Sequence, residues 1–149
     1  MIIGIPKEKK MGEARVPLIP DHVSLLTKQG HKVFVERDAG KKCRFSNKAY
    51  EKAGAKIVDD VYDCEMIVRV KEPPMATIRK NQIIMGYLHV EKGQNMALLK
   101  KFLDQNSTTY AYENIRDDSG DRLVNLGVEA GIVGMYEGIR LYGKVLAKN

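Results

Sequence analysis

Six short apolar runs alternate with segments of helical spacing along the chain, and together they predict the fold. The runs lie at residues 2–5, 31–36, 55–58, 64–70, 83–88 and 108–112. Each run has the length of a strand, and helical patterns separate several of them. Strands that alternate with helices predict a parallel sheet covered on both faces. We therefore expect an α/β fold in three layers, helix, sheet and helix, with a mainly parallel sheet.

Apolar spacing within two of the helical segments predicts which side chains share a face. The helix that opens at Pro20 and stops at Gly30 is expected to bury a stripe formed by Val23, Leu25 and Leu26. In the helix over residues 95–103, a spacing of three and four places three large apolar residues on one face, namely Met96, Leu99 and Leu103.

The last segment, residues 127–146, carries five glycines among apolar residues. Small residues of this kind allow a helix to approach a backbone or a ligand closely. Their spacing is not that of the dinucleotide fingerprint G-x-G-x-x-G, which follows a strand directly and occurs nowhere in the 149 residues. The expected fold is thus similar to flavodoxin and Rossmann folds without that fingerprint. If the chain works with a nicotinamide cofactor, the domain that grips it lies outside this sequence.

Composition and charge narrow the class of protein. A chain of 149 residues with 44% hydrophobic and 30% charged residues is typical of one globular domain, and we treat residues 1–149 as that domain. We expect a cytoplasmic protein, because no run is long enough for a membrane span and no leader pattern precedes the first strand. Two separated cysteines without a metal-ligand spacing predict no metal site. The net charge of +6 is interleaved with acidic residues, which fits an anionic small molecule better than nucleic acid.

Three ionisable groups follow predicted strands and are candidates for chemistry. Lys71 and His89 end two neighbouring apolar runs, and ligands of parallel sheets bind beyond the carboxyl ends of strands. The polar loop 7–15 follows the first strand, and its Arg15 could hold a carboxylate with a bidentate fork. From the residues alone other interpretations stay open: an exposed lysine, a histidine satisfied in the core and a solvated charged loop.

Four segments resemble a known family along nearly the whole chain. They are the opening I-G-I-P-K-E with E-A-R-V-P-L-I-P (2–20), A-G-A-K-I-V (53–58), V-K-E-P (70–73) and Y-L-H (87–89). The chain resembles the N-terminal domain shared by alanine dehydrogenase, the nicotinamide nucleotide transhydrogenase α-subunit and the saccharopine dehydrogenase group.

Two later segments resemble the saccharopine branch more closely. H-V-E-K-G-Q (89–94) is similar to that branch's H-x-x-K-x-Q, and G-V-E-A-G-I-V-G (127–134) is similar to its F-G-x-x-A-G-x-A-G. Leu126 departs from the branch pattern, where phenylalanine is usual. The resemblance implies the substrate-binding half of an NAD(P)-dependent oxidoreductase acting on the CH–NH group of an amino acid, most like the lysine-forming saccharopine dehydrogenase. The alternatives are the same half of an alanine dehydrogenase, and a stand-alone module that binds an amino acid or docks on a partner without catalysis.

The resemblance also implies roles for individual residues. Lys71 and His89 would be the acid and base that move protons during amine oxidation. Arg15 would bind the substrate carboxylate, and the residues expected beside it in the substrate site are Lys10, Glu13, Lys92, Gln94 and Glu113.

Family architecture sets the expected partners. The resemblance implies an amino or keto acid as ligand, and NAD or NADP held mainly by a Rossmann domain of the same or a partner chain. We expect residues 1–149 to form only one wall of the catalytic cleft and to be inactive alone. Self-association into a homo-oligomer is also open, since a domain without its usual partner can expose an apolar patch.

Overall fold

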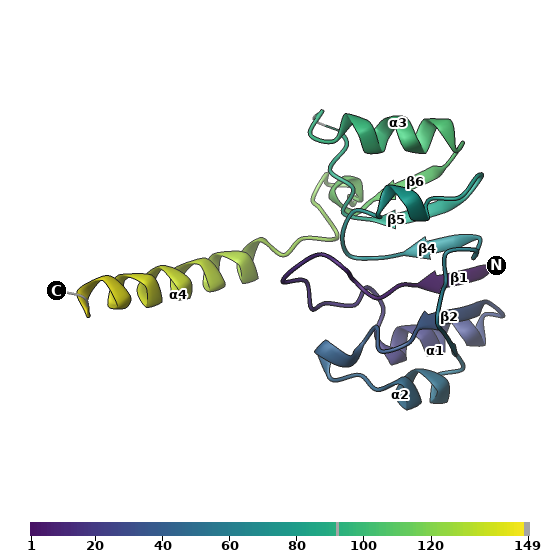
Figure 1. The fold of residues 1–149 in the computed structure, drawn as a ribbon, viewed down its shortest axis with the longest axis horizontal. Coiled ribbons are helices and arrows are strands. Elements are labelled where there is room, and N and C mark those ends of the chain that lie inside the picture. Colours follow the sequence, from purple (N-terminus) through teal and green to yellow (C-terminus); the bar gives the residue numbers. More distant parts are fainter. Residues whose placement is uncertain (92, 148–149) are drawn as a thin grey trace. The chain divides into compact units, whose positions relative to one another are not determined.

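The computed structural model describes residues 1–91 and 93–147, which form two compact units. The first unit covers Met1–Ile115 and the second covers Arg116–Asn149. Figure 1 shows the strands of the first unit together with its helices, and α4 of the second. The two units are described separately below.

The first unit is a six-stranded parallel sheet with helices between its strands, so the predicted α/β fold is confirmed. Its strands are β1 (Ile2–Ile5), β2 (Lys32–Glu36), β3 (Lys56–Val58), β4 (Met66–Val68), β5 (Ile83–Gly86) and β6 (Thr108–Ala111). Its α-helices are α1 (Pro20–Lys28), α2 (Asn47–Lys52) and α3 (Met96–Asp104), and its short 3-10 helices are η1 (Lys41–Cys43), η2 (Met75–Thr77) and η3 (Tyr112–Asn114).

The strands lie in the order β3-β2-β1-β4-β5-β6. The chain therefore moves from β1 outward to β3, returns to pair β4 with β1, and then moves outward in the opposite direction to β6. This reversal places the topological switch point between β1 and β4, and open α/β sheets bind their ligands beyond the carboxyl ends of the strands at such a point. The two halves of the sheet thus direct the loops after β1 and β4 toward one place.

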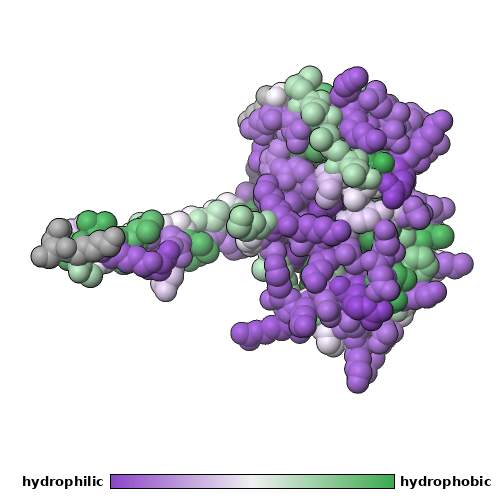
Figure 2. Space-filling view, viewed as in Figure 1, coloured by the Kyte–Doolittle hydropathy of each residue, from purple (hydrophilic) through white to green (hydrophobic). Residues whose placement is uncertain are grey.

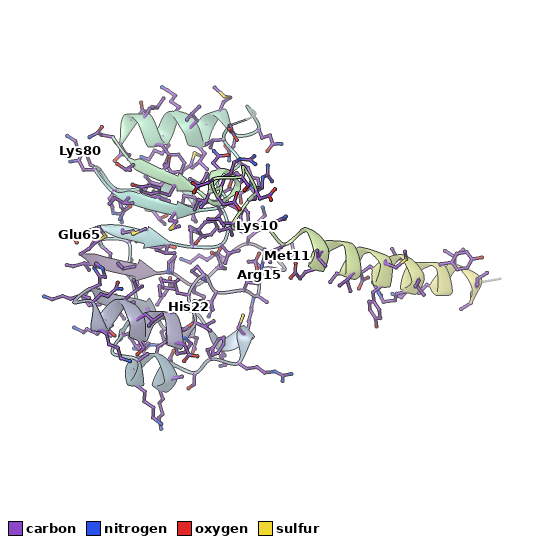
Figure 3. The ribbon with its side chains drawn as sticks, turned by 180° about the vertical axis from the view of Figure 1, so that it is seen from behind. Lys10, Met11, Arg15, His22, Glu65 and Lys80 are labelled. Atoms are coloured by element: carbon purple, nitrogen blue, oxygen red, sulfur yellow. The ribbon has the colours of Figure 1, made fainter. Side chains whose placement is uncertain are left out.

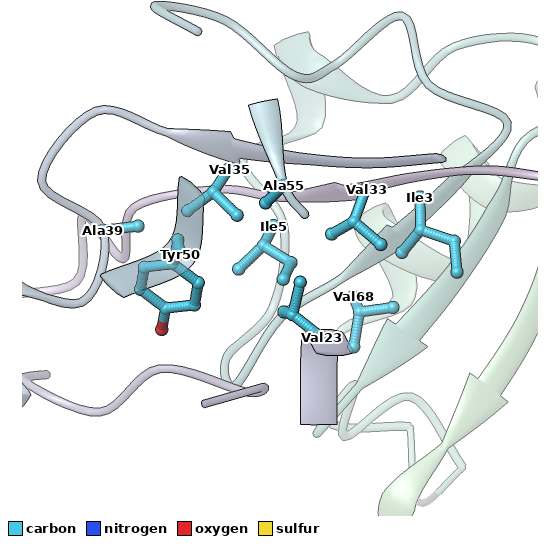
Figure 4. Close-up of a cluster of buried hydrophobic side chains, with 9 residues drawn as sticks. All are labelled: Ile3, Ile5, Val23, Val33, Val35, Ala39, Tyr50, Ala55 and Val68. Carbon is cyan, nitrogen blue, oxygen red and sulfur yellow. The ribbon is translucent and has the colours of Figure 1, made fainter. Parts of the chain in front are cut away.

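One face of the sheet packs against α1 and α2. Ile3 and Ile5 of β1 alternate with outward neighbours, and with Val33 and Val35 of β2 they form a buried layer. Val23 of α1 and Tyr50 of α2 complete this cluster, which Figure 4 shows in close-up. Tyr50 is fully buried and its hydroxyl donates a hydrogen bond to the carbonyl of Leu18, which fixes the segment before α1.

The opposite face is covered by the segment before β4 and by α3. Ile67 of β4 and Ile84 of β5 are register partners on this face. Ile67 packs with Val61 and Tyr62, and Ile84 packs with Phe102 of α3. Layers on both faces confirm the predicted helix-sheet-helix arrangement.

Two helix faces differ from the prediction. In α1, Val23 is buried but Leu25 is 61% exposed, because a spacing of two residues places them on nearly opposite sides of a helix. In α3 the buried residues are Leu98 and Phe102, whereas two of the three expected face residues, Met96 and Leu103, are exposed. The predicted stripe of α3 lies on one face, and that face is turned mostly toward solvent.

Several strands are shorter than their apolar runs. β4 covers three residues of the run 64–70, and β5 ends at Gly86 rather than at residue 88. Apolar side chains beyond these ends remain buried without a ladder on both sides; Val70 and Leu88 are 6% and 0% exposed. The predicted strands were too long because apolar residues stay buried beyond the point where the strand is paired on both sides.

The second unit contains a short isolated bridge and one long helix. Arg116 pairs with Arg122 across a turn held by Asp117, and α4 then runs over Gly127–Leu146. Apolar side chains of α4 are exposed at more than half of their area, and they include Val128, Ile132, Met135, Ile139 and Tyr142. Figure 2 shows hydrophobic residues along this helix. Among the described residues, no helix is both long and apolar enough to cross a membrane.

Candidate functional site

Most of the predicted site residues of the first unit lie beyond the carboxyl ends of its strands. Arg15 is in the loop after β1, Lys71 follows β4, and His89 and Glu113 follow β5 and β6. Figure 3 shows Lys10 and Arg15 at one edge of the sheet, and Glu65 and Lys80 at the opposite edge. The parallel topology therefore brings the candidates to one edge of the sheet, around the switch point between β1 and β4.

Arg15 is clamped by the carboxylate of Glu13. Its Nε donates to Oε1 at 2.8 Å and its Nη2 donates to Oε2 at 2.6 Å, while the arginine side chain stays 44% exposed. Glu13 thereby occupies the side-on edge of the guanidinium and leaves the end-on edge, with Nη1, for another carboxylate. This hydrogen bonding outweighs burial, and with the nearby Lys71 charge it lowers the pKa of Glu13 to about 2.

Two residues of η1 fix the loop that carries Arg15. Lys42 Nζ donates to the carbonyl of Glu13 at 3.2 Å, and Cys43 Sγ donates to the carbonyl of Ala14 at 3.0 Å. A pocket of about 10 Å³ lies between these elements, which is room for about one water molecule. A substrate carboxylate must therefore approach Arg15 from its exposed side.

Glu72 joins two of the predicted residues, His89 and Lys10. Its Oε1 lies 2.8 Å from His89 Nδ1 and its Oε2 lies 3.3 Å from Lys10 Nζ. Burial raises the pKa of Glu72, but hydrogen bonds from its own backbone, His89 and Lys10 outweigh burial and lower it. An ionised carboxylate only accepts hydrogen bonds, so Nδ1 of His89 is the donor to Glu72, and this contact does not use Nε2.

The position of His89 is fixed by further contacts. Its backbone has a φ of 51° and its backbone N–H donates to Glu113 Oε1 at 2.7 Å. Its ring stacks on Tyr87, with centroids 6.1 Å apart, and Tyr87 meets Tyr112 edge to face. Burial raises the pKa of Tyr112 to about 12, so this phenol stays protonated. A backbone in the left-handed region is costly for histidine, and the Glu113 bond offsets part of that cost.

Arg15, Lys71 and His89 are connected through shared neighbours. Glu13 binds Arg15 and responds to the charge of Lys71, while Tyr87 stacks on His89 and raises the pKa of Arg15 by its charge, after the larger effect of Glu13. One edge of the sheet thus carries three groups. They are the guanidinium of Arg15, with its end-on edge open, the half-buried amine of Lys71, and the imidazole of His89, whose Nε2 is not bound by Glu72. These groups can hold a carboxylate and move protons at an adjacent carbon.

Two predicted residues do not join this cluster. Gln94 is exposed, and no hydrogen bond links it to the site residues within 1–91 and 93–147. Lys92 lies outside the described residues. Lys10 belongs to the cluster through the ion pair of its exposed ammonium with Glu72.

Sequence reasoning named Glu13 and Glu113 and missed two further carboxylates that support the site, Glu72 and Glu8. Glu72 stands in the V-K-E-P segment beside Lys71 and pairs with His89. The two residues follow neighbouring strands, and comparison of these two strand ends could have predicted their contact. Glu8 is buried after β1 and its Oε1 accepts from the backbone N–H groups of Val70 and Lys71. Nothing in the local pattern separates Glu8 from the other charged residues of its loop.

Metal ions and dinucleotides each need particular groups at the edge of the sheet. No group of three or more His, Cys, Asp and Glu in the described part of the chain could hold a metal ion. A dinucleotide pyrophosphate needs free backbone N–H groups and glycines after β1. Here Pro6 and the buried carboxylate of Glu8 follow that strand, and a second anion would be repelled. The described residues therefore do not fit a dinucleotide at this position.

The fold and the site together define a class of domain: a parallel α/β domain that presents a carboxylate-binding arginine beside an amine and an imidazole. Residues 4–133 match the family described as "Alanine dehydrogenase/PNT, N-terminal domain". The chain belongs to this family, as its sequence motifs predicted.

Curated relatives and solved structures agree with this assignment. The chain is 43% identical over 123 residues to an alanine dehydrogenase of Bacillus subtilis, covering 78% of the chain and 32% of that protein. It is 36% identical over 146 residues to alanine dehydrogenase 1 of Staphylococcus aureus, covering 91% and 39%.

Among solved structures, an L-alanine dehydrogenase superposes with a TM-score of 0.75 at 35% identity, over 81% of this chain and 35% of that one. A transhydrogenase from Sinorhizobium meliloti superposes with a TM-score of 0.70 at 27% identity, over 76% and 35%. The chain thus spans about a third of the length of the relatives it matches.

Proposed function

We propose that this chain is the substrate-binding half of an amino-acid dehydrogenase of the alanine dehydrogenase type, with pyruvate or alanine as ligand. The observation that carries the proposal is the Glu13–Arg15 clamp, which presents an open guanidinium edge beside Lys71 and His89. The named relatives support the same substrate, because the curated ones cited above are alanine dehydrogenases.

The chemistry of amine oxidation needs the groups that the site provides. Loss of hydride from an amino acid gives an imine, water then adds to form a carbinolamine, and collapse yields the keto acid and ammonia. Protons must leave the nitrogen and the added water, so an acid and a base are required. We assign carboxylate binding to Arg15 and proton transfer to Lys71 and to His89 Nε2, which the Glu72 bond leaves free.

The hydride acceptor is proposed to be NAD or NADP, bound by a part of a longer protein outside residues 1–149. Glu8 and Pro6 after β1 do not fit a dinucleotide, and relatives that the chain matches are about three times its length. In this proposal the chain supplies one wall of the catalytic cleft, and a Rossmann domain of the same or a partner chain supplies the other.

Alanine is proposed in place of saccharopine, which the later sequence segments favoured. Saccharopine carries three carboxylates and needs several free cations. Among the described residues expected for it, Lys10 is paired with Glu72, and Arg15 keeps an open guanidinium edge. One arginine edge suits a monocarboxylate such as pyruvate.

A titration of the isotope-labelled chain with pyruvate tests the proposal. Amide and imidazole NMR signals of residues around Arg15 and His89 are expected to shift in a saturable manner. Arg15→Ala is expected to weaken pyruvate binding by roughly 10- to 100-fold, since a charge-assisted bidentate bond contributes about 1.5–3 kcal/mol.

Arg79→Ala is the matched control, because Arg79 also pairs with a carboxylate, Asp63 at 3.3 Å, and precedes β5, whereas the candidate site follows the strands. Equal pyruvate affinity of the wild type and Arg15→Ala would refute the proposal. If saccharopine binds more tightly than pyruvate and its binding depends on Arg15, the domain would instead be assigned to the saccharopine branch.

A further inference from the structure

A buried ion pair lies under the candidate site and is not used by the proposed chemistry. Glu8 and Arg69 have side chains 2% and 1% exposed, and Arg69 Nη2 donates to Glu8 Oε2 at 2.8 Å. The Nε and Nη1 atoms of Arg69 are buried with no hydrogen-bond partner among the described residues. Orphaned donors and two desolvated charges make this pair a costly way to stabilise a fold. Its geometry suggests a different role.

The other oxygen of Glu8 completes an interrupted ladder. β1 pairs with β4 through the register partners Gly4 and Ile67, and Pro6 then carries the chain away from the sheet. On the β5 side, hydrogen bonds continue past the end of β4, where Arg69 N–H donates to the carbonyl of Met85 and Tyr87 N–H donates to that of Val70. On the β1 side, the N–H groups of residues 70 and 71 have no strand partner.

Glu8 Oε1 accepts from both of these groups. It lies 2.7 Å from the nitrogen of Val70 and 3.3 Å from that of Lys71. The side chain of Glu8 therefore replaces a strand at the point where the chain must end its ladder and still deliver Lys71 to the site. Arg69, one residue earlier, neutralises the carboxylate in its buried place.

We propose that Glu8 is a positioning residue for Lys71: it fixes the peptide that carries the proposed acid or base, and the hydrogen bond from Arg69 orients its carboxylate. The functional part of this inference rests on the proposed function. A peptide held by one carboxylate cannot rotate without breaking two hydrogen bonds, so the Cα–Cβ direction of Lys71 is set. Misplacement of such a group by about 1 Å can cost up to about 100-fold in rate.

The test compares two double variants of the whole chain. Glu8→Leu with Arg69→Met removes both charges and both acceptor bonds, whereas Glu8→Gln with Arg69→Met removes the charges and keeps an amide oxygen as acceptor. Apolar replacement of both members of a buried ion pair is often neutral for stability, so both variants are expected to fold.

Two measurements follow, hydrogen exchange of the Val70 and Lys71 amides and pyruvate affinity by NMR. The Leu/Met variant is expected to exchange these amides at least about tenfold faster and to bind pyruvate about tenfold more weakly than the Gln/Met variant. If the ion pair only stabilised the fold, glutamine at position 8 would not selectively restore the protection of the Val70 and Lys71 amides and the pyruvate affinity. Equal exchange rates and equal affinities in the two variants would overturn the inference.

The two proposals fail in distinguishable ways. If the wild type binds no pyruvate, the proposed function is wrong, and the amide exchange rates still decide whether Glu8 fixes the Lys71 peptide. If a double variant does not fold, Glu8→Asp replaces it, because aspartate keeps the charge and is one methylene shorter. Fast exchange at Lys71 in this variant supports the role of Glu8, and unchanged protection contradicts it.

Discussion

Carboxylates hold each functional group of the site in place. Glu13 binds the side-on edge of the Arg15 guanidinium, and Glu72 binds Nδ1 of His89. The backbone of His89 is bound by Glu113, while that of Lys71 is bound by Glu8. A cationic site needs this support because arginine and lysine side chains lose rotamer freedom when they are held. Each acidic residue therefore acts on geometry as well as on charge.

The depressed pKa of Glu13 predicts a pH-dependent contribution to stability. Its pKa is about 2 in the folded chain against 4.5 for an ordinary glutamate, so the unfolded state binds the proton more readily. The contribution is present above about pH 4.5 and is lost as pH falls toward 2. Urea unfolding of the wild type and Glu13→Gln is expected to show a difference in unfolding free energy at pH 6 that shrinks at pH 3.

Glu51→Gln is the control for this comparison, since Glu51 is exposed on α2 and lies outside the site. Its unfolding free energy is expected to follow that of the wild type at both pH values. A Glu13→Gln difference that stays the same or grows on acidification would show that the carboxylate gains nothing from Arg15.

At the residue scale, the sequence allowed prediction of the candidate groups and of only part of what supports them. Arg15, Lys71 and His89 could be named because they follow strands and match family motifs, and Glu13 and Glu113 were named beside them. Glu8 could not be named, because it meets residues 70 and 71 across more than sixty positions of chain. Such a pairing depends on the order of the strands, and local patterns do not contain it.

Helices and strands were predicted well where the apolar residues followed one clear pattern of spacing. All six strands occur within their apolar runs, because buried parallel strands are short and continuous. α3 was predicted in position but not in orientation, since its apolar residues form two overlapping stripes. The stripe with Leu98 and Phe102 packs on Ile84 and Leu88, and the other stripe remains mostly exposed. Contacts with the sheet, rather than helical spacing, select the buried face.

The orientation of α3 predicts contrasting effects of two adjacent substitutions. Phe102 is 3% exposed and Leu103 is 71% exposed. Phe102→Ala is expected to lower the unfolding free energy by roughly 3–5 kcal/mol, because it leaves a cavity against Ile84. Leu103→Ala is expected to change it by less than about 0.5 kcal/mol. Urea unfolding followed by circular dichroism measures both values.

Leu103→Ala is the matched control, since it truncates a large side chain on the same helix one position away. Equal losses in the two variants would mean that α3 buries the stripe that spacing first suggested. The comparison therefore distinguishes the two orientations of α3.

On the scale of the whole molecule, the fold and the candidate site belong to the first unit. Met1–Ile115 contains the six strands, the three buried clusters and every described candidate residue. Arg116–Asn149 contributes α4, whose apolar side chains are exposed. The strand order that places the switch point between β1 and β4 is complete within the first unit. Site geometry and exposed apolar surface are thus carried by different parts of the chain.

This division predicts the behaviour of a variant ending at Ile115. The shortened chain is expected to keep the far-UV circular dichroism of the sheet and to bind pyruvate within about twofold of the whole chain, because the carboxylates that bind Arg15, Lys71 and His89 belong to the first unit. It is also expected to remain monomeric in sedimentation experiments. The whole chain is expected to self-associate as its concentration rises, since α4 exposes Val128, Ile132 and Met135.

Replacement of these exposed side chains in the whole chain separates loss of the helix from loss of its apolar surface. A variant with Ile132→Gln and Met135→Gln keeps α4, since glutamine is a good helix former, and is expected to sediment as the shortened chain does. Self-association that persists in both variants would place the contact on the first unit. Loss of pyruvate binding on truncation would mean that α4 supports the site, and the carboxyl edge of the sheet would then be insufficient for substrate recognition.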